Sequence, residues 1–398
     1  MEKEQKTITN ANEVRQNKLN VPTLRFDGFG DNWTIATLSD VCSYRKERRT
    51  LEKKYYVSTE NILQNYQGIE RFDSNDKISG DAFDKNDVLM GNIRPYLKKV
   101  CFADFDGVCN ADVLVFKSKA LNPKYLHCVL ANDSFINYVM SSVKGSKMPR
   151  GDKNYIMQYP LSYPSELEQA KISNFIEILT KRIEIQNKII EDLKVLKKEL
   201  CNKVFNSSCC DSEIKVRGIA RVYGGYAFSS KTYVDNGQYK IITIGNVTGE
   251  HFISGEYNTV DCLPQNIQKQ QILDNGDILI SLTGNVGRIS LVKGNKFLLN
   301  QRVAKLAIEE KALKDYVYQY LSHSFFEKDM QNAGQGAAQK NIKNEDILSY
   351  NIRIPSEKAT LENIVNLFLT YDKKIENEMN IINHLQRQKS FFLNTMFI

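Results

Sequence analysis

Two long stretches of the sequence carry the same alternation of apolar and polar positions. In residues 165–205, and again in residues 356–397, apolar side chains recur at alternating spacings of four and three residues. The mean spacing is that of a coiled-coil seam. Neither stretch contains glycine or proline, and each starts with Ser-Glu after a proline, which is typical of a capped helix start. We therefore predict two long helices over these ranges.

In each stretch the recurring apolar positions form a ladder, and polar residues interrupt the two ladders at equivalent positions. Gln186 and Lys197 interrupt the first ladder where Glu378 and Lys389 interrupt the second. A lone amphipathic helix packed on its own domain is the alternative, but it would not need about 40 residues. We predict an intramolecular antiparallel coiled coil in which Glu378 faces Lys197 and Gln186 faces Lys389, so that no charge is buried alone. The predicted seam includes Ile176, Leu179, Ile183, Ile190, Leu193, Lys197, Ile375, Glu378, Ile382 and Leu385.

Each predicted helix closes one copy of a duplicated unit. The segments PSELEQAKISNFIEILTKRIE, from Pro164, and PSEKATLENIVNLFLTYDKKIE, from Pro355, match with one inserted residue. Upstream, Asp87 and Asp277 match at an offset of 190 residues. Each copy also holds short β-like runs, then a short helix (about 123–143 and 314–331) and a Gly-containing loop before the long helix. Such ordered self-similarity predicts a duplication.

These elements predict an α+β fold. It consists of two tandem pseudo-symmetric α/β domains joined by two long helices that form the antiparallel coiled coil, as a rod with a globular unit at each end. We expect a flexible tail at 1–20, domains at 21–163 and 207–353, a central spacer helix within 164–206 and a C-terminal one within 354–398.

Composition narrows the class of protein. The 398 residues are 42% hydrophobic and 25% charged, with a formal net charge of +7, so the chain is globular and mildly basic. The first 20 residues are polar, which argues against a secretory signal, and no apolar run approaches the ~20 residues that span a bilayer. Because the eight cysteines then read as reduced thiols, we expect a cytoplasmic protein.

Sequence motifs of catalysis are missing. There is no G-x-x-x-x-G-K, H-E-x-x-H or G-x-S-x-G, and no zinc-ligand spacing of Cys and His. We therefore expect no catalytic residue, no metal site and no cofactor on this chain.

The positive signals concern polyanions. Residues 45–54 hold six cations and two acids, so this run is either a solvated surface loop or a phosphate-contacting face. Residues 144–153 and 334–343 form Gly-containing basic loops at the same place in the two copies, and residues 91–99 and 283–288 form a third matched pair. The candidate DNA-binding residues are Arg45, Lys46, Arg48, Arg49, Arg94, Lys98, Lys147, Arg150, Lys153, Lys231, Arg288, Gln339, Lys340 and Lys343.

With these features the chain resembles the specificity subunits of Type I restriction-modification systems. The resemblance runs from about Val21 to Phe397. It rests on the opening Val-Pro-x-Leu-Arg-Phe-x-x-Phe-x-x-x-Trp from Val21, on Gly-Gly-Tyr-Ala-Phe-Ser-Ser from Gly224, on Gly276-Asp-Ile-Leu and on the Pro-Ser-Glu helix starts. The first copy departs from this pattern: it has Ser-Tyr-Arg-Lys-Glu-Arg-Arg from Ser43 in place of the Gly-Gly-Tyr-Ala-Phe run.

The resemblance implies a non-catalytic reader of double-stranded DNA. Two target-recognition domains would each bind one half of a bipartite target, and the coiled coil would set the gap between the halves. Two modification subunits with S-adenosylmethionine, and restriction subunits with ATP and Mg²⁺, would supply adenine methylation and cleavage. A single-chain methyltransferase or nuclease and a protein-binding coiled-coil scaffold remain alternatives from the residues alone.

Overall fold

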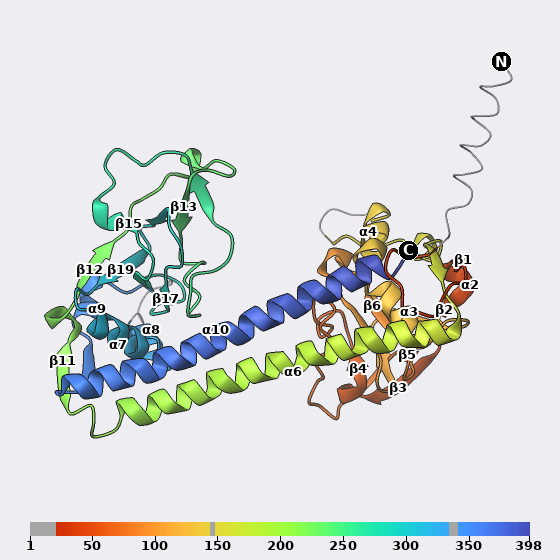
Figure 1. Cartoon of the computed structure of the whole chain (residues 1–398), viewed down its shortest axis with the longest axis horizontal. Helices are drawn as coiled ribbons and strands as arrows, with labels where there is room; N and C mark the ends of the chain where they lie inside the picture. The colour runs from red at the N-terminus through yellow and green to blue at the C-terminus, as the bar shows by residue number, and fades with distance from the viewer. Residues whose placement is uncertain (1–20, 144–147, 334–340) are drawn as a thin grey trace, which may run out of the picture. The chain divides into compact units, whose positions relative to one another are not determined.

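The computed structural model describes residues 21–143, 148–333 and 341–398, and Figure 1 shows the order of its elements along the chain. The chain divides into two compact units. The first ends at Gln186 and also includes Ile381–Ile398, and the second is Asn187–Asn380. Each long helix therefore contributes one half to each unit.

The two long helices form close to their predicted bounds. Helix α6 is Glu166–Phe205, with 40 residues, and helix α10 is Lys358–Thr395, with 38 residues. Glu166 and Glu168 lie in the first turn of α6, where carboxylates interact favourably with the helix dipole. The start of α10 is anchored by the Asp211 carboxylate, which accepts hydrogen bonds from the backbone N–H and the hydroxyl of Ser356 at 2.8 and 2.7 Å.

Within each unit the helix halves pack antiparallel, as predicted. In the first unit the start of α6 meets the end of α10, where the rings of Phe175 and Phe392 make an edge-to-face contact at 4.8 Å. In the second unit the end of α6 meets the start of α10, with the rings of Phe205 and Phe368 5.5 Å apart. All predicted seam residues are buried or half-buried, which confirms the apolar ladder.

The predicted pairing of Glu378 with Lys197 is wrong. The Lys197 ammonium pairs with Asp372, six residues earlier in α10, and Glu378 pairs with Lys374 of its own helix. Asp372 lies off the apolar ladder but is also buried, and Gln319, from a helix of the globular part, donates a second hydrogen bond to it. The second predicted pair, Gln186 with Lys389, stays a prediction.

The first unit contains two four-stranded sheets and a two-stranded one. Strands β1 (Thr34–Thr37) and β10 (Pro160–Tyr163) pair antiparallel beside the start of α6. One four-stranded sheet has the order β2-β9-β6-β7 and is antiparallel throughout; the other has the order β3-β5-β8-β4, in which β4 is parallel to β8. The remaining bounds are β2 Cys42–Tyr44, β3 Arg48–Glu52, β4 Tyr56–Val57, β5 Lys77–Phe83, β6 Val88–Gly91, β7 Val100–Phe102, β8 Gly107–Cys109, β9 Val113–Ser118, α2 Leu38–Val41, α3 Pro123–Leu130, α4 Asp133–Ser141 and α5 Lys153–Ile156.

The second unit repeats this plan. Strands β11 (Ser212–Lys215) and β20 (Asn351–Ile354) pair antiparallel, and the sheets have the orders β12-β19-β16-β17 and β14-β13-β18-β15, with β13 parallel to β18. The remaining bounds are β12 Arg221–Gly224, β13 Tyr239–Ile242, β14 Asn258–Val260, β15 Ile272–Leu273, β16 Ile278–Ser281, β17 Ile289–Leu291, β18 Phe297–Leu299, β19 Val303–Ala307, α7 Lys311–Leu321, α8 Ser324–Ala333 and α9 Asn344–Leu348.

The matching strand orders bear out the duplication, with one difference between the copies. Three strands of the second sheet correspond, β5-β8-β4 in the first unit and β15-β18-β13 in the second. The fourth strand lies at opposite edges: β3 beside β5 in the first unit, and β14 beside β13 in the second. The basic run 45–54 is therefore not simply a loop, because its residues 48–52 are the extra edge strand β3.

A buried asparagine recurs in the two units, in Ser-x-x-Asn61-Ile of the first and Thr-x-x-Asn246-Val of the second. The Asn61 side chain accepts from the Ser58 N–H at 2.6 Å and donates to the Glu70 carbonyl. Asn246 likewise accepts from the Thr243 N–H at 2.9 Å and donates to the carbonyl of Glu256. Each side chain satisfies backbone groups of an irregular loop that strands could not pair, so the asparagine shapes the loop.

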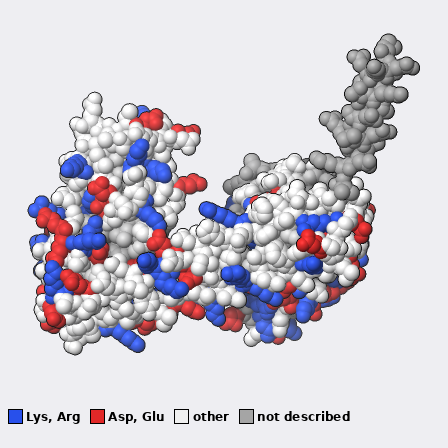
Figure 2. Space-filling model, viewed as in Figure 1, with Lys and Arg blue, Asp and Glu red and all other residues white. Residues whose placement is uncertain are grey.

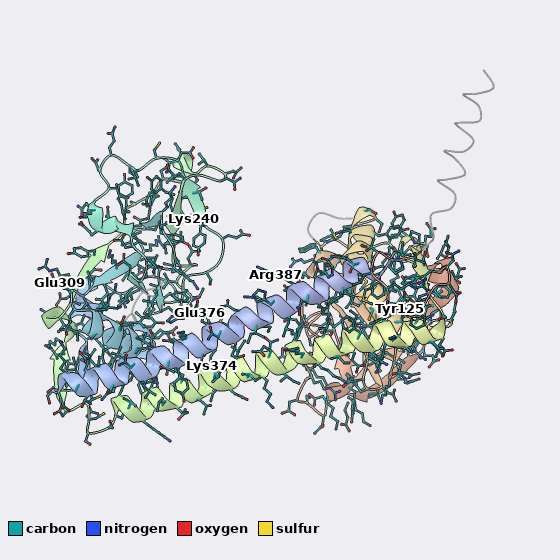
Figure 3. All side chains as sticks on the ribbon, viewed as in Figure 1. Tyr125, Lys240, Glu309, Lys374, Glu376 and Arg387 are labelled. Atoms are coloured by element: carbon teal, nitrogen blue, oxygen red, sulfur yellow. The ribbon has the colours of Figure 1, made fainter. Side chains whose placement is uncertain are left out.

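Residues 21–33 fasten the first unit to both of its helix segments. Arg25 donates two hydrogen bonds, at 2.7 and 2.8 Å, to the buried carboxylate of Glu168 on α6. The backbone N–H of Leu24 donates to the carbonyl of Thr395 on α10 at 3.0 Å. Trp33 is buried in the core, where its ring meets Tyr125 of α3, the residue labelled in Figure 3.

The contribution of this attachment to stability can be measured through the fluorescence of Trp33. Replacing Arg25 with Ala leaves the Glu168 carboxylate buried without its cation, and we expect the first unit to lose about 3 kcal/mol of stability. Because Trp33 is the sole tryptophan and lies in this unit, its fluorescence during urea unfolding measures the loss. The control is Lys181→Ala, which removes a 64% exposed ammonium from Glu177 and leaves the transition in place. Equal transitions for wild type and Arg25→Ala contradict the prediction.

Candidate nucleic-acid interface

Two of the six cations of the basic run 45–54, Arg45 and Arg49, are held in internal ion pairs. The Arg45 guanidinium is only 7% exposed and lies 2.8 Å from Asp87 and 2.9 Å from Asp84. Arg49 holds the other oxygen of Asp84 at 2.6 Å, and this hydrogen bond lowers the pKa of the Asp84 carboxyl. These two arginines therefore brace β3 against the turn before β6. The partner acids follow about 40 residues later, so the local sequence could not reveal them.

Of the other cations of the run, Lys46 and Arg48 face solvent, whereas Lys53 and Lys54 are half-buried and Lys54 pairs with Glu52. Lys46 is exposed and has no ion pair among the described residues. Arg48 is 74% exposed, and its closest acid, Asp81, is 3.9 Å away. Lys46 and Arg48 thus stay available to a polyanion, while Arg45 and Arg49 do not.

Two sequence patches of the first unit come together in one structure. The loop after β6 and the segment before α5 are joined by the buried side chain of Asn92, which donates to the carbonyl of Gly151 and accepts from its N–H, each at 3.1 Å. Ile93 and Arg150 form a β-bridge, and the Arg94 N–H donates to the Pro149 carbonyl at 2.8 Å. We call residues 92–99 with 148–153 the first loop pair.

The same junction recurs in the second unit. Here the loop after β16 meets the segment before α9: the Ile342 N–H donates to the Leu282 carbonyl at 3.0 Å, and Thr283 bridges Asn341. We call residues 282–288 with 341–343 the second loop pair. Gly284 and Gly287 adopt positive φ values of 73° and 80°, which suits a tight, glycine-bearing turn. The loops that match between the two copies in sequence therefore also form equivalent structures.

The cations of the loop pairs divide into paired and unpaired groups. Lys98 lies 2.8 Å from Asp133, Arg150 3.0 Å from Asp112, and Arg288 3.3 Å from Glu327. Exposed cations without an ion pair among the described residues are Arg94, Lys153 and Lys343, with Lys231 on a 3₁₀ turn elsewhere in the second unit. Lys147, Gln339 and Lys340, which we also predicted as contacts, lie outside the described residues.

Charge on the visible surface is mixed in sign. Figure 2 shows Lys and Arg interspersed with Asp and Glu over this face of both units. Within residues 21–143, 148–333 and 341–398, no group of three or more His, Cys, Asp or Glu side chains could hold a metal ion. No helix in this part of the chain is long and apolar enough to cross a membrane.

Each unit is thus an α+β domain with a polar loop pair, closed by antiparallel segments of the two long helices. The family model of the Type I restriction modification DNA specificity domain matches the sequence twice, over residues 30–195 and 212–387. The chain belongs to this family.

Known proteins resemble the chain over most of its length. The Type I restriction enzyme MjaVIII specificity subunit of Methanocaldococcus jannaschii is 23% identical, over 92% of each chain. Among solved structures, the S subunit of the Type I restriction-modification system of M. genitalium has a TM-score of 0.56 at 16% identity, covering 95% of this chain and 99% of that one. A chain from a study of complex assembly and conformational transition of the type I system has a TM-score of 0.55 at 17% identity, covering 91% and 96%.

The junction at Asn92 makes a second prediction. Replacing Asn92 with Ala leaves the buried N–H and C=O of Gly151 unpaired, at a cost of about 1–3 kcal/mol. We expect the first loop pair to separate, which speeds hydrogen exchange of the Gly151 and Arg94 amides. Asn154→Ala, which removes an exposed amide from α5 in the same unit, serves as the control. Unchanged exchange in Asn92→Ala would show that the backbone bridge alone holds the loops.

Proposed function

We propose that this chain is the DNA-recognition subunit of a Type I restriction-modification complex, and that each unit reads one half of a bipartite target. The observation that carries the proposal is the recurrence of a polar loop pair at the equivalent place in two copies of the DNA specificity domain. Cations on such loops contact phosphates, while amides and guanidinium groups donate to base edges.

The long helices connect the two recognition units in this proposal. Because α6 and α10 are continuous and free of glycine and proline, they act as a stiff spacer that sets the gap between the half-sites. A fixed gap is needed since both units must meet compatible faces of a duplex that repeats every ~34 Å.

In this proposal, partner subunits carry out the methylation and cleavage reactions. We propose that two modification subunits bring S-adenosylmethionine and methylate adenine, and that restriction subunits use ATP and Mg²⁺ to cleave. Specificity subunits are in general non-catalytic, and this chain binds and positions DNA for its partners.

An outer stripe of α6 fits the docking of a modification subunit. Ile178 and Ile185, two turns apart in the first unit, are 64% and 62% exposed, and Leu196 is 56% exposed further along α6. Isoleucines at heptad spacing outside an existing seam favour a further helix, because ridges at this spacing interlock with a helical partner. We assign this stripe to an apolar helix of the modification subunit.

Methylation-site mapping tests the proposed function. The chain is co-expressed with a Type I modification subunit, and modified adenines are mapped by long-read sequencing. We expect a bipartite motif with a fixed gap that disappears when this chain is omitted. A soluble complex without any new motif would reject the proposal, and methylation by this chain alone would reject its non-catalytic role.

The outer stripe makes a prediction of its own. In Ile178→Ser/Ile185→Ser the apolar contact area is lost, and we expect co-purification of the modification subunit to fall at least tenfold, with Trp33-reported stability unchanged. Ile35→Ser, in the same unit, removes an isoleucine that is 75% exposed but lies on β1, so this variant keeps full co-purification. Equal loss in both variants would place the docking surface elsewhere.

A further inference from the structure

The backbone of Arg94 has an unusual conformation. Its φ and ψ angles of 51° and 63° lie in the left-handed region, which non-glycine residues rarely adopt. Pro95 follows directly and opens the short 3₁₀ turn Pro95–Leu97. Such outliers persist only where the surrounding structure enforces them, and they concentrate at binding sites.

The second unit places glycine at this position. Gly284 lies 190 residues after Arg94, the same offset as Asp277 from Asp87, and it also has positive φ, at 73°. Glycine adopts this conformation without steric cost. At this backbone position the first unit therefore has arginine, with a large cationic side chain, where the second unit has glycine, which has no side chain.

The turn around Arg94 is held from two sides. The Arg94 N–H donates to Pro149 in the partner segment of the first loop pair, and its carbonyl accepts from Leu97 at 2.9 Å. The carbonyls of Leu97 and Lys98 accept from the N–H groups of Asn65 and Tyr66 at 3.1 and 3.0 Å. With its backbone fixed in this way, the start of the Arg94 side chain has a set direction.

No acid in the described part of the chain pairs with the Arg94 guanidinium. Arg45, Arg49 and Arg150 each have a carboxylate within 3.0 Å, whereas Arg94 is exposed and has no ion pair among the described residues. Its neighbour Tyr96 is 48% exposed as well. An unpaired, forked donor on a rigid turn is suited to two parallel hydrogen bonds with one acceptor group.

We propose that Arg94 is a specificity-determining residue that reads a guanine in the first half-site. Its guanidinium donates to guanine O6 and N7 in the major groove, the bidentate contact for which arginine geometry is suited. A phosphate contact needs charge but no fixed direction, and the flexible cations Lys46 and Lys153 can supply it. This role rests on the proposed function and assigns one base pair of the target to one residue.

Arg94→Gly separates this role from a structural one. Glycine removes the side chain and also the backbone strain, so we expect the Trp33-reported melting temperature to stay equal or rise. In the complex with a modification subunit, affinity for the wild-type target should fall about 5- to 150-fold. The mapped motif should lose its preference at one guanine of one half-site and keep the other half-site. Arg94→Lys, which retains the charge without the fork, should not restore that preference.

Lys296→Gly is the matched control. Lys296 is another exposed cation with positive φ, at 60°, but it lies in the turn before β18 and belongs to neither segment of the second loop pair. We expect this variant to keep both the affinity and the motif, although it removes one positive charge and the same kind of strain.

The outcomes distinguish this inference from the proposed function. A wild-type complex without a bipartite motif overturns both. A wild-type motif that Arg94→Gly leaves unchanged overturns the role of Arg94 alone. Equal weakening on all sequences, with rescue by Arg94→Lys and a salt slope reduced by about 0.9 in Arg94→Gly, makes Arg94 a phosphate contact and overturns base reading.

Discussion

Burial of the apolar seam between α6 and α10 is the interaction on which both units depend. The main core of the first unit includes Ile172 of α6 and Met396, the residue after the end of α10, and a core cluster of the second joins Phe205 of α6 to Phe368 of α10. Neither cluster closes without both helices, because each helix offers only a stripe of apolar surface that must be covered. The fold of each unit is thus coupled to segments about 200 residues apart in the chain.

Polar contacts then fix the globular parts on this apolar seam. Asp372 of α10 receives Lys197 of α6 and Gln319 of α7, so one buried carboxylate ties both helices to the second unit. Lys293 reaches Glu376, which Figure 3 shows on α10, and Lys194 reaches Glu250 at 2.9 Å. In the first unit the ion pair of Arg25 with Glu168 likewise attaches the globular part to α6. Directional bonds of this kind orient the sheets, and hence the loop pairs, where apolar packing alone would permit sliding.

The loop pairs combine a shared backbone junction with different side chains. Both junctions contain a main-chain bridge, at Ile93 with Arg150 and at Thr283 with Asn341, and in the first unit the buried Asn92 side chain adds two hydrogen bonds. Because none of these contacts uses the side chain at the turn, that side chain is free to differ, as Arg94 and Gly284 do. The edge strands differ too, β3 in the first unit and β14 in the second. Such freedom on a constant frame lets the duplicated units present different side chains from equivalent loops.

The sequence by itself determined the duplication, the two long helices, their antiparallel seam and the family, since these depend on short-range periodicity and repeated motifs. It also indicated which loops match between the copies. Only the tertiary structure decided that Arg45 and Arg49 are held by Asp84 and Asp87, that Lys197 pairs with Asp372 and not Glu378, and that Arg94 has a left-handed backbone. The physical reason is that ion pairs and loop closures join residues far apart in the chain. Local sequence patterns do not indicate which distant residues come into contact.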